Sequence, residues 1–367
     1  MIKLRLIGLL NLFLSVLIYA QQKPGYYRYE GKLGPRDAVL EIAVRPSSDI
    51  GQLEEIEPLS SFYYFKDDLV PVALYKGKDS KGENIILNEI SEDSQERFEG
   101  VCNDKVFKGK WYWNPSDKGE DIVLYAKQIK PEDQLNYFQE YKVVKVPVKG
   151  GERALEGAMT FSAFLPSDPL VAKMLTRRIT TDQFDDFGNY AKAKIKDFEQ
   201  SYKREVQEQF SGEDAEYSSI MDHVHNYNLY PVINTGQYLI MAYSTFTYTG
   251  GAHGMNADKY YNYSKKKKKW LQLEDVFDLS QKAAIEKVLD QELRRQYSIP
   301  PGIKLSQAKD SDFIADKIAV TDNFTLSKFN ITFHYYPYEL TPYAMGSFEL
   351  SVPYENFKGL FEKGFHY

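Results

Sequence analysis

The pattern of apolar and polar positions changes character at about residue 130 of the chain. Before that point, apolar and aromatic residues alternate with polar ones in short runs, separated by turns rich in Gly, Asp and Ser. Short alternating runs at regular spacing are typical of antiparallel strands joined in a meander. Such a sheet curls or closes to hide its edges. The strands expected here cover residues 25–31, 39–44, 62–65, 72–75, 85–89, 97–101, 108–113 and 122–125.

The second part of the chain mixes strands with helices and lacks strict βαβ alternation. Asp168 and Pro169 form a good helix start, with Asp as the cap and Pro in the first turn. Residues 189–210 carry apolar side chains every three or four positions, which predicts a longer helix. A third helix is expected to be capped by Ser280. Strands are expected at residues 141–148, 221–232, 238–248, 324–326, 329–335 and 347–352.

These patterns predict an α+β protein with two domains. An N-terminal antiparallel β-rich domain, a meander that curls or closes like a barrel, is expected over residues 21–130, and a mixed α+β domain over residues 139–367. The Pro-Glu-Asp-Gln sequence at residues 131–134 marks the expected boundary. The one cysteine, Cys102, has no partner for an internal disulfide and is expected to be a small buried apolar residue.

Residues 1–20 have the layout of a secretory signal peptide. A short basic start with Lys3 and Arg5 precedes an apolar stretch that ends in Ala20. The stretch is short and interrupted for a membrane-spanning helix, although an uncleaved anchor is the alternative. We therefore expect a periplasmic or secreted protein, with no stable membrane insertion after the signal is removed.

Charge narrows the class of partner. The formal net charge is −6, which argues against nucleic acid, because nucleic-acid binders concentrate basic charge. The conspicuous exception is the run of five lysines at residues 265–269. It lies between two expected strands, so we interpret it as a solvated hairpin tip, with a patch for an acidic partner as the alternative.

A glycine-rich stretch surrounds His253. Gly250, Gly251 and Gly254 have two interpretations. They either allow the backbone conformations that a tight connection requires, or they expose the histidine and backbone N–H groups to a ligand. Spacing alone favours the first interpretation. His223 and His225 lie two apart on an expected strand and could form a zinc site with His253. Strand histidines are more often solvated or hydrogen-bonded, so we predict no metal site.

A second stretch, residues 336–343, combines tyrosines with two prolines and Glu339. Prolines reduce the entropy lost on binding, and tyrosines provide rigid amphipathic contacts. This favours a preformed recognition loop for a protein or a sugar. A loop whose tyrosines pack back on the sheet is an equally good interpretation at this point.

Catalytic motifs are missing from the sequence. We find no Gly-x-Ser-x-Gly elbow, no His-Glu-x-x-His helix and no phosphate-binding Gly-Lys-Ser/Thr loop. A pair of carboxylates that hydrolyses glycosides stays an alternative, because the 52 acidic residues of the chain offer too many possible pairs to choose from. We therefore expect no catalytic residues and no cofactor.

The second part resembles the RsiV-like extracytoplasmic domain of lysozyme-sensing anti-sigma factors, which also accompanies some secreted polysaccharide deacetylases. One motif that carries the resemblance is Tyr-Thr-Gly-Gly-Ala-His-Gly at residues 248–254, followed by Leu-Gln-Leu-Glu-Asp-Val-Phe at residues 271–277. The other is Tyr-Tyr-Pro-Tyr-Glu-Leu-Thr-Pro-Tyr-Ala-Met-Gly at residues 335–346, with Val-Pro-Tyr at residues 352–354.

The resemblance implies binding rather than catalysis. The expected partner is a lysozyme-like protein or cell-wall glycan, such as peptidoglycan. The chain lacks the sigma-binding and deacetylase regions of the proteins it resembles, so neither of those activities is carried over. An enzyme acting on cell-envelope polysaccharide and a structural surface protein are the alternatives. The residues expected to bind are Tyr338, Glu339, Pro342 and Tyr343, followed by His253, Gly250 and Gly251.

Overall fold

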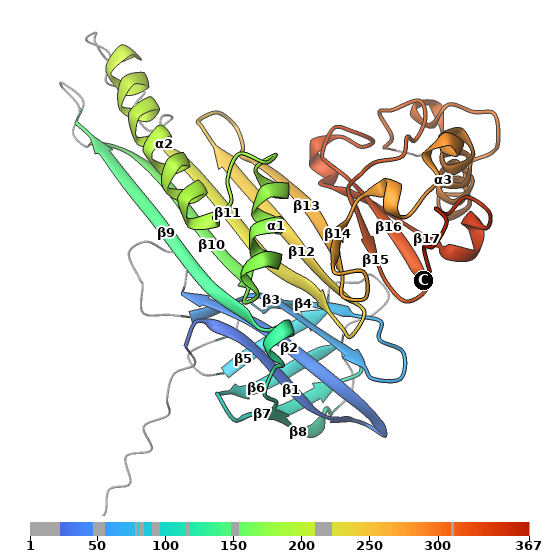
Figure 1. Cartoon of the computed structure of the whole chain (residues 1–367). Helices are drawn as coiled ribbons and strands as arrows, with labels where there is room; N and C mark the ends of the chain where they lie inside the picture. Colours follow the sequence, from blue (N-terminus) through green and yellow to red (C-terminus); the bar gives the residue numbers. More distant parts are fainter. Residues whose placement is uncertain are drawn as a thin grey trace, which may run out of the picture.

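A computed structural model describes residues 23–46, 56–77, 80, 84–89, 96–114, 118–147, 154–209, 222–309 and 312–366. The expected signal peptide at residues 1–20 lies outside this part of the chain. The protein is α+β, as the sequence predicts, with a β-barrel followed by mixed sheets and helices (Figure 1). Among the described residues, no helix has both the length and the apolar character needed to span a membrane.

The first part is a closed barrel of eight antiparallel strands. Strand β1 pairs with β8 through Tyr29 opposite Ala126, which closes the sheet and leaves no free edge. Alternate residues of each strand point inward, so large apolar side chains such as Phe98 and Phe107 fill the interior. The strands are β1 Gly25–Leu33, β2 Arg36–Pro46, β3 Ile56–Phe65, β4 Val72–Lys76, β5 Asn84–Glu89, β6 Arg97–Cys102, β7 Val106–Tyr112 and β8 Glu120–Ala126.

The prediction that Cys102 is a small buried residue is confirmed. Its side chain is buried among apolar residues and lies 3.0 Å from the hydroxyl of Tyr29.

The second part is a six-stranded sheet in the order β14-β13-β12-β11-β10-β9. Among the described strands of this sheet, only β10 and β11 run parallel to each other, and the crossover between them contains α1 and α2. Both helices lie on one face of the sheet and the barrel lies against the other side (Figure 1). The elements are β9 Leu135–Val146, β10 Leu155–Pro166, α1 Pro169–Ile179, α2 Phe187–Gln209, β11 His223–Asn234, β12 Tyr238–Tyr248, β13 Met255–Ser264 and β14 Lys269–Leu271.

Helix starts follow the sequence signals in one case and depart from them in another. Asp168 caps α1, and its carboxylate accepts hydrogen bonds from the backbone N–H groups of Leu170 and Val171. The prediction that Ser280 caps the third helix is wrong. Asp278 caps a short 3₁₀ turn, Leu279–Gln281, and Ser280 donates its hydroxyl to Asp278. Aspartate takes the cap because its carboxylate accepts from both the Ser280 N–H and hydroxyl groups.

The C-terminal part is a three-stranded antiparallel sheet in the order β15-β16-β17, packed against α3. Two buried asparagines fasten it to β13. Asn262 donates to the carbonyl of Phe324 at 2.7 Å, and Asn323 donates to the carbonyl of Asp258 at 2.7 Å. The elements are α3 Lys282–Gln296, β15 Phe324–Leu326, β16 Asn330–Tyr335 and β17 Phe348–Pro353, with 3₁₀ turns at Leu273–Asp275, Leu305–Gln307, Tyr343–Met345 and Tyr354–Phe357. Another 3₁₀ turn, Pro131–Asp133, lies between β8 and β9.

A buried polar network joins the barrel to the six-stranded sheet. Lys265 donates to Asp133 Oδ1 at 2.5 Å and to Asn234 Oδ1 at 2.8 Å. Asn234 in turn donates to the Tyr26 hydroxyl of β1, and its backbone carbonyl accepts from Arg28. The solvated interpretation of the lysine run is therefore wrong for its first residue, because the side chain of Lys265 is only 16% exposed.

The same network contains a fully buried carboxyl group, that of Glu41. Arg28 lies 2.9 Å from Glu41 Oε1, and the Tyr64 hydroxyl also donates to this oxygen. No described residue donates to the other oxygen, Oε2. Burial therefore raises the pKa of Glu41 well above its usual range, and burial also lowers the pKa of Lys265.

Candidate recognition surface

The hairpin between β12 and β13 needs its glycines for backbone reasons. Gly250 and Gly251 have φ angles of 89° and 94°, which side chains rarely allow. A Cβ atom on Gly254 would lie 2.4 Å from the ring of Phe246. The Tyr248 hydroxyl donates to the carbonyl of Gly251 at 3.1 Å, which fixes the turn. Gly250 and Gly251 therefore shape the loop, and the exposed side chain of His253 is the group that the loop presents.

The loop between β16 and β17 is closed by its own hydrogen bonds. The Tyr338 N–H donates to the carbonyl of Thr341 at 3.0 Å. The Glu339 carboxylate accepts from the Tyr336 N–H at 2.8 Å, so this side chain holds the loop as well as facing solvent. Tyr338 has a φ of 72°, an unusual value for a non-glycine residue. Pro342 precedes the 3₁₀ turn that carries Tyr343.

These two loops meet, although they are far apart in the sequence. The rings of His253 and Tyr343 stack with their centroids 3.9 Å apart and an angle of 15° between their planes. The Tyr343 hydroxyl donates to the carbonyl of Gly254. Tyr338 in turn stacks on Tyr343, and the centroids of these two rings are 5.9 Å apart. We call His253, Tyr343 and Tyr338 the aromatic stack.

The aromatic stack is accessible from solvent. Tyr338 is 54% exposed, and the neighbouring Met345 is 56% exposed. Met255, two residues after His253, is also exposed. Tyr343 packs back on the hairpin, whereas Tyr338 is exposed, so the tyrosines of this loop do not all pack inward. That the loop recognises a partner stays a prediction. The exposed methionines are residues that the sequence analysis missed, and no periodic pattern marks them.

Acidic groups surround the base of this loop. Burial, Asp322, Glu339 and Asp258 together raise the pKa of Tyr336 to about 12. Asp322 is itself paired with Lys259 at 2.6 Å. The surroundings of Tyr336 therefore carry negative charge that is only partly neutralised.

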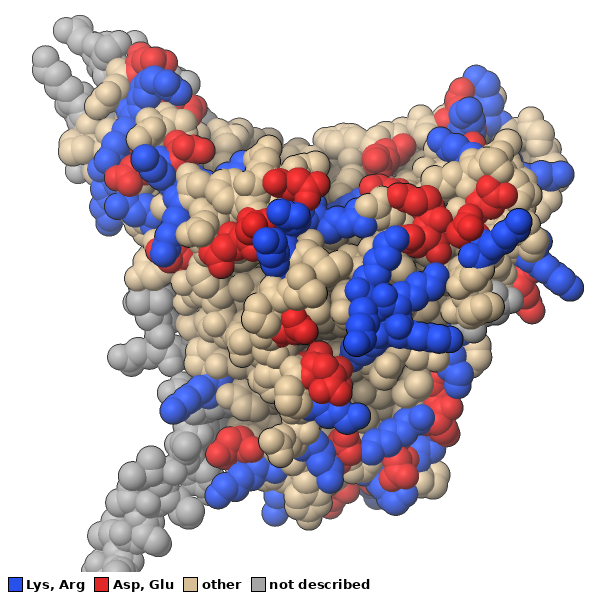
Figure 2. Space-filling view, in the orientation of Figure 1, with Lys and Arg blue, Asp and Glu red and all other residues tan. Residues whose placement is uncertain are grey.

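Figure 2 shows the shape of the face on which this hairpin ends. Its upper outline is hollowed between the free end of α2 and the C-terminal part, and the β12–β13 hairpin ends between these two projections in Figure 1. A hollow of this kind can receive a convex partner.

The other two histidines lie in a different environment. His223 is buried against Tyr202, and His225 packs edge-on against Phe198 of α2. Burial lowers the pKa of both imidazoles. His253 instead stacks on Tyr343, so the three histidines do not gather. Among the described residues, no group of three His, Cys, Asp or Glu side chains could hold a metal ion.

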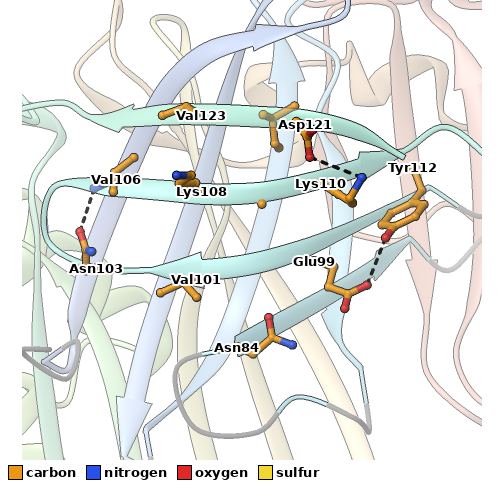
Figure 3. Close-up of a pocket in the computed structure, with 12 residues that line it drawn as sticks. Asn84, Glu99, Val101, Asn103, Val106, Lys108, Lys110, Tyr112, Asp121 and Val123 are labelled. Atoms are coloured by element: carbon orange, nitrogen blue, oxygen red, sulfur yellow. Dashed lines mark hydrogen bonds and ion pairs between the residues drawn. The ribbon is translucent and has the colours of Figure 1, made fainter. Parts of the chain in front are cut away.

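The outer face of the barrel contains a groove that the sequence did not indicate. It has a volume of about 940 Å³ and crosses β6, β7 and β8. Figure 3 shows valines at one end, including Val101 and Val123, and polar groups at the other. There Lys110 pairs with Asp121 at 3.4 Å, and the Tyr112 hydroxyl lies 3.4 Å from Glu99. These polar groups are already paired with each other, and none of the expected site residues lies there.

Comparisons with known proteins give a family match over part of the chain. Among solved structures, the chain matches that of a DUF3298 family member from Bacteroides fragilis NCTC 9343. That structure is 19% identical, with a TM-score of 0.49, and the match covers 62% of this chain and 94% of the other. A DUF3298 family protein from Pseudomonas aeruginosa PAO1 matches at 19% identity and a TM-score of 0.40, covering 64% of this chain and 97% of the other.

No curated protein matches the chain. Residues 274–355 match a protein family of unknown function, DUF3298. This segment contains the tyrosine loop and ends just after β17, whereas His253 and its glycines precede it.

Proposed function

We propose that the chain is an exported, non-catalytic binding module of the cell envelope that recognises a lysozyme-like protein through the aromatic stack. The observation that carries the proposal is that two loops separated in the sequence place His253, Tyr343 and Tyr338 in one exposed cluster. Tyrosine and methionine are enriched at protein interfaces, and rigid stacked rings lose little entropy on binding.

Charge favours a basic partner. C-type lysozymes are basic proteins, and Asp258, Asp322 and Glu339 lie near Tyr336, which belongs to the loop that carries Tyr338 and Tyr343. Complementary charge raises the association rate and disfavours acidic partners. The resemblance to the RsiV-like domain rests on the same two loops, which supports the same class of partner. Export to the periplasm or the medium is part of the proposal and rests on residues 1–20.

Cell-wall glycan is the second candidate ligand. The exposed ring of Tyr338 with the adjacent Glu339 carboxylate offers an apolar face and a hydrogen-bond acceptor, which is the combination that a sugar ring contacts. The proposal assigns no catalytic step to either ligand.

Calorimetric titration of the mature protein with a C-type lysozyme tests the proposal. We expect Tyr338→Asn to weaken binding about tenfold or more, because an exposed tyrosine at the centre of an interface is a typical hot spot. Asparagine tolerates the positive φ of this position, so the loop keeps its shape. Tyr125→Ala, which removes an equally exposed tyrosine from the barrel, is the matched control and should leave binding unchanged.

Three outcomes count against the proposal in different ways. Absence of saturable binding removes lysozyme as the ligand. If Tyr338→Asn and Tyr125→Ala behave alike, the binding surface lies elsewhere. If peptidoglycan fragments bind and lysozyme does not, with the same dependence on Tyr338, the glycan is the ligand.

A further inference from the structure

A second pocket lies where the turn after β13 meets the C-terminal end of the chain. It has a volume of about 410 Å³, within the range of small-molecule sites. Tyr238, Leu271 and Phe365 provide apolar walls, and Lys266, Lys267 and His366 provide polar groups. Figure 2 shows Lys and Arg side chains gathered over this turn, beside the C-terminal end.

Four of the five lysines of the run have three different roles. Lys265 is buried in the network that joins the barrel to the sheet, and Lys269 pairs with Asp275 at 2.6 Å. Lys266 and Lys267 line the pocket, and no carboxylate among the described residues forms an ion pair with either. Among the residues that the structure describes, no Asp or Glu lines the pocket. In a chain of net charge −6, this is a local concentration of positive charge, with Asp275 near enough for Lys267 to lower its pKa.

The turn that carries these lysines is held in place. The Lys265 N–H donates to the carbonyl of Gln237 at 3.0 Å, and its buried ammonium anchors the start of the turn. The Lys267 N–H donates to the Ser264 hydroxyl at 3.2 Å. Lys267 Nζ lies 5.8 Å from the centre of the Phe365 ring, so a cation is already held above an apolar wall. Ordering of the turn lowers the entropy cost of closing its lysines on a ligand.

Glycines leave the pocket open. A Cβ atom built on Gly236 or Gly364 meets no heavy atom within 4 Å. Gly236 lacks a positive φ, so a larger side chain on this lining residue would add bulk at the pocket without backbone strain.

We propose that this pocket binds a small organic anion that carries a carboxylate, sulfonate or phosphate group on an apolar or aromatic body. The lysine ammonium groups and His366 would hold the anionic group, and Tyr238, Leu271 and Phe365 would cover the apolar body. Charge-assisted hydrogen bonds to such groups are stronger than neutral ones, and the apolar walls select against inorganic anions.

The probe we would use is 8-anilinonaphthalene-1-sulfonate, whose fluorescence rises when it enters an apolar site. At low salt we expect the double variant Lys266→Gln/Lys267→Gln to bind about tenfold more weakly than wild type, because each lost ammonium removes a charge-assisted bond. The difference should shrink at high salt. Gly236→Leu should abolish saturable binding, because its side chain fills the space.

Lys268→Asn is the matched control. Lys268 belongs to the same turn but does not line the pocket, and Asn suits its φ of 50°. We expect it to bind the probe like wild type. Circular dichroism and thermal melting would show that all variants fold. Equal binding by wild type, the lysine double variant and Gly236→Leu would overturn the proposal, as would an equal loss in Lys268→Asn.

Discussion

Replacing Lys265 by alanine is expected to lower the free energy of unfolding by about 3 kcal/mol, because it removes the nearest cation from the largely buried carboxylate of Asp133 and leaves only the more distant Arg28, at 3.9 Å, to pair with it among the described residues. The ammonium of Lys265 donates to Asp133, to Asn234 and to the carbonyl of Thr235. The side chain of Asp133 is only 13% exposed, so water replaces the lost partner poorly. The same network joins the barrel to the six-stranded sheet, so its loss weakens the contact between these two parts.

Urea denaturation followed by tryptophan fluorescence would measure this effect, since Trp111 lies in the barrel and Trp270 in the sheet. Lys266→Ala is the control, because its side chain is exposed in the adjacent position. We expect it to change stability by less than about 0.5 kcal/mol. Similar losses in the two variants would show that Lys265 has no special role in the joint.

Replacing Gly109 by alanine is expected to destabilise the barrel by about 3 kcal/mol or more. Gly109 lies directly opposite Gly100 on the neighbouring strand. A Cβ atom on Gly109 would lie 2.1 Å from the carbonyl oxygen of Glu99 and 2.5 Å from the Cα atom of Gly100. These are backbone atoms of a paired strand, so relief of the clash requires β6 and β7 to separate.

Thermal and urea denaturation of Gly109→Ala would measure this loss. Gly236→Ala is the matched control, because its Cβ atom would enter open space at a position without positive φ. We expect the control to lie within about 0.5 kcal/mol of wild type. Wild-type stability in Gly109→Ala would mean that the two strands do not approach as closely as their glycines indicate.

The alternation of apolar and polar residues was enough to predict most of the strands of the barrel. Each of the eight strands expected before residue 130 overlaps a strand of the barrel, because a strand with one face in a core must alternate. That this sheet curls or closes into a barrel followed from the rule that proteins avoid exposed sheet edges. The error at Ser280 is local, since Asp278 and Ser280 are both good caps and only the contacts decide between them.

The candidate surface was predictable in its parts but not in its assembly. The sequence marked His253 and Tyr343 separately, yet their stacking depends on how Asn262 and Asn323 fasten the C-terminal sheet to β13. The prediction that Lys265 is solvated was wrong for the same reason. Its neighbours in the sequence are exposed lysines, whereas its partner Asp133 lies far away along the chain.

Amide hydrogen exchange of the protein with and without a C-type lysozyme would test the central claim most directly. The claim is that the β12–β13 hairpin and the β16–β17 loop form one recognition surface. The prediction is slower exchange on binding in both residues 250–254 and residues 336–346, with little change in the barrel. Protection confined to one of these loops, or located on the barrel instead, would contradict it.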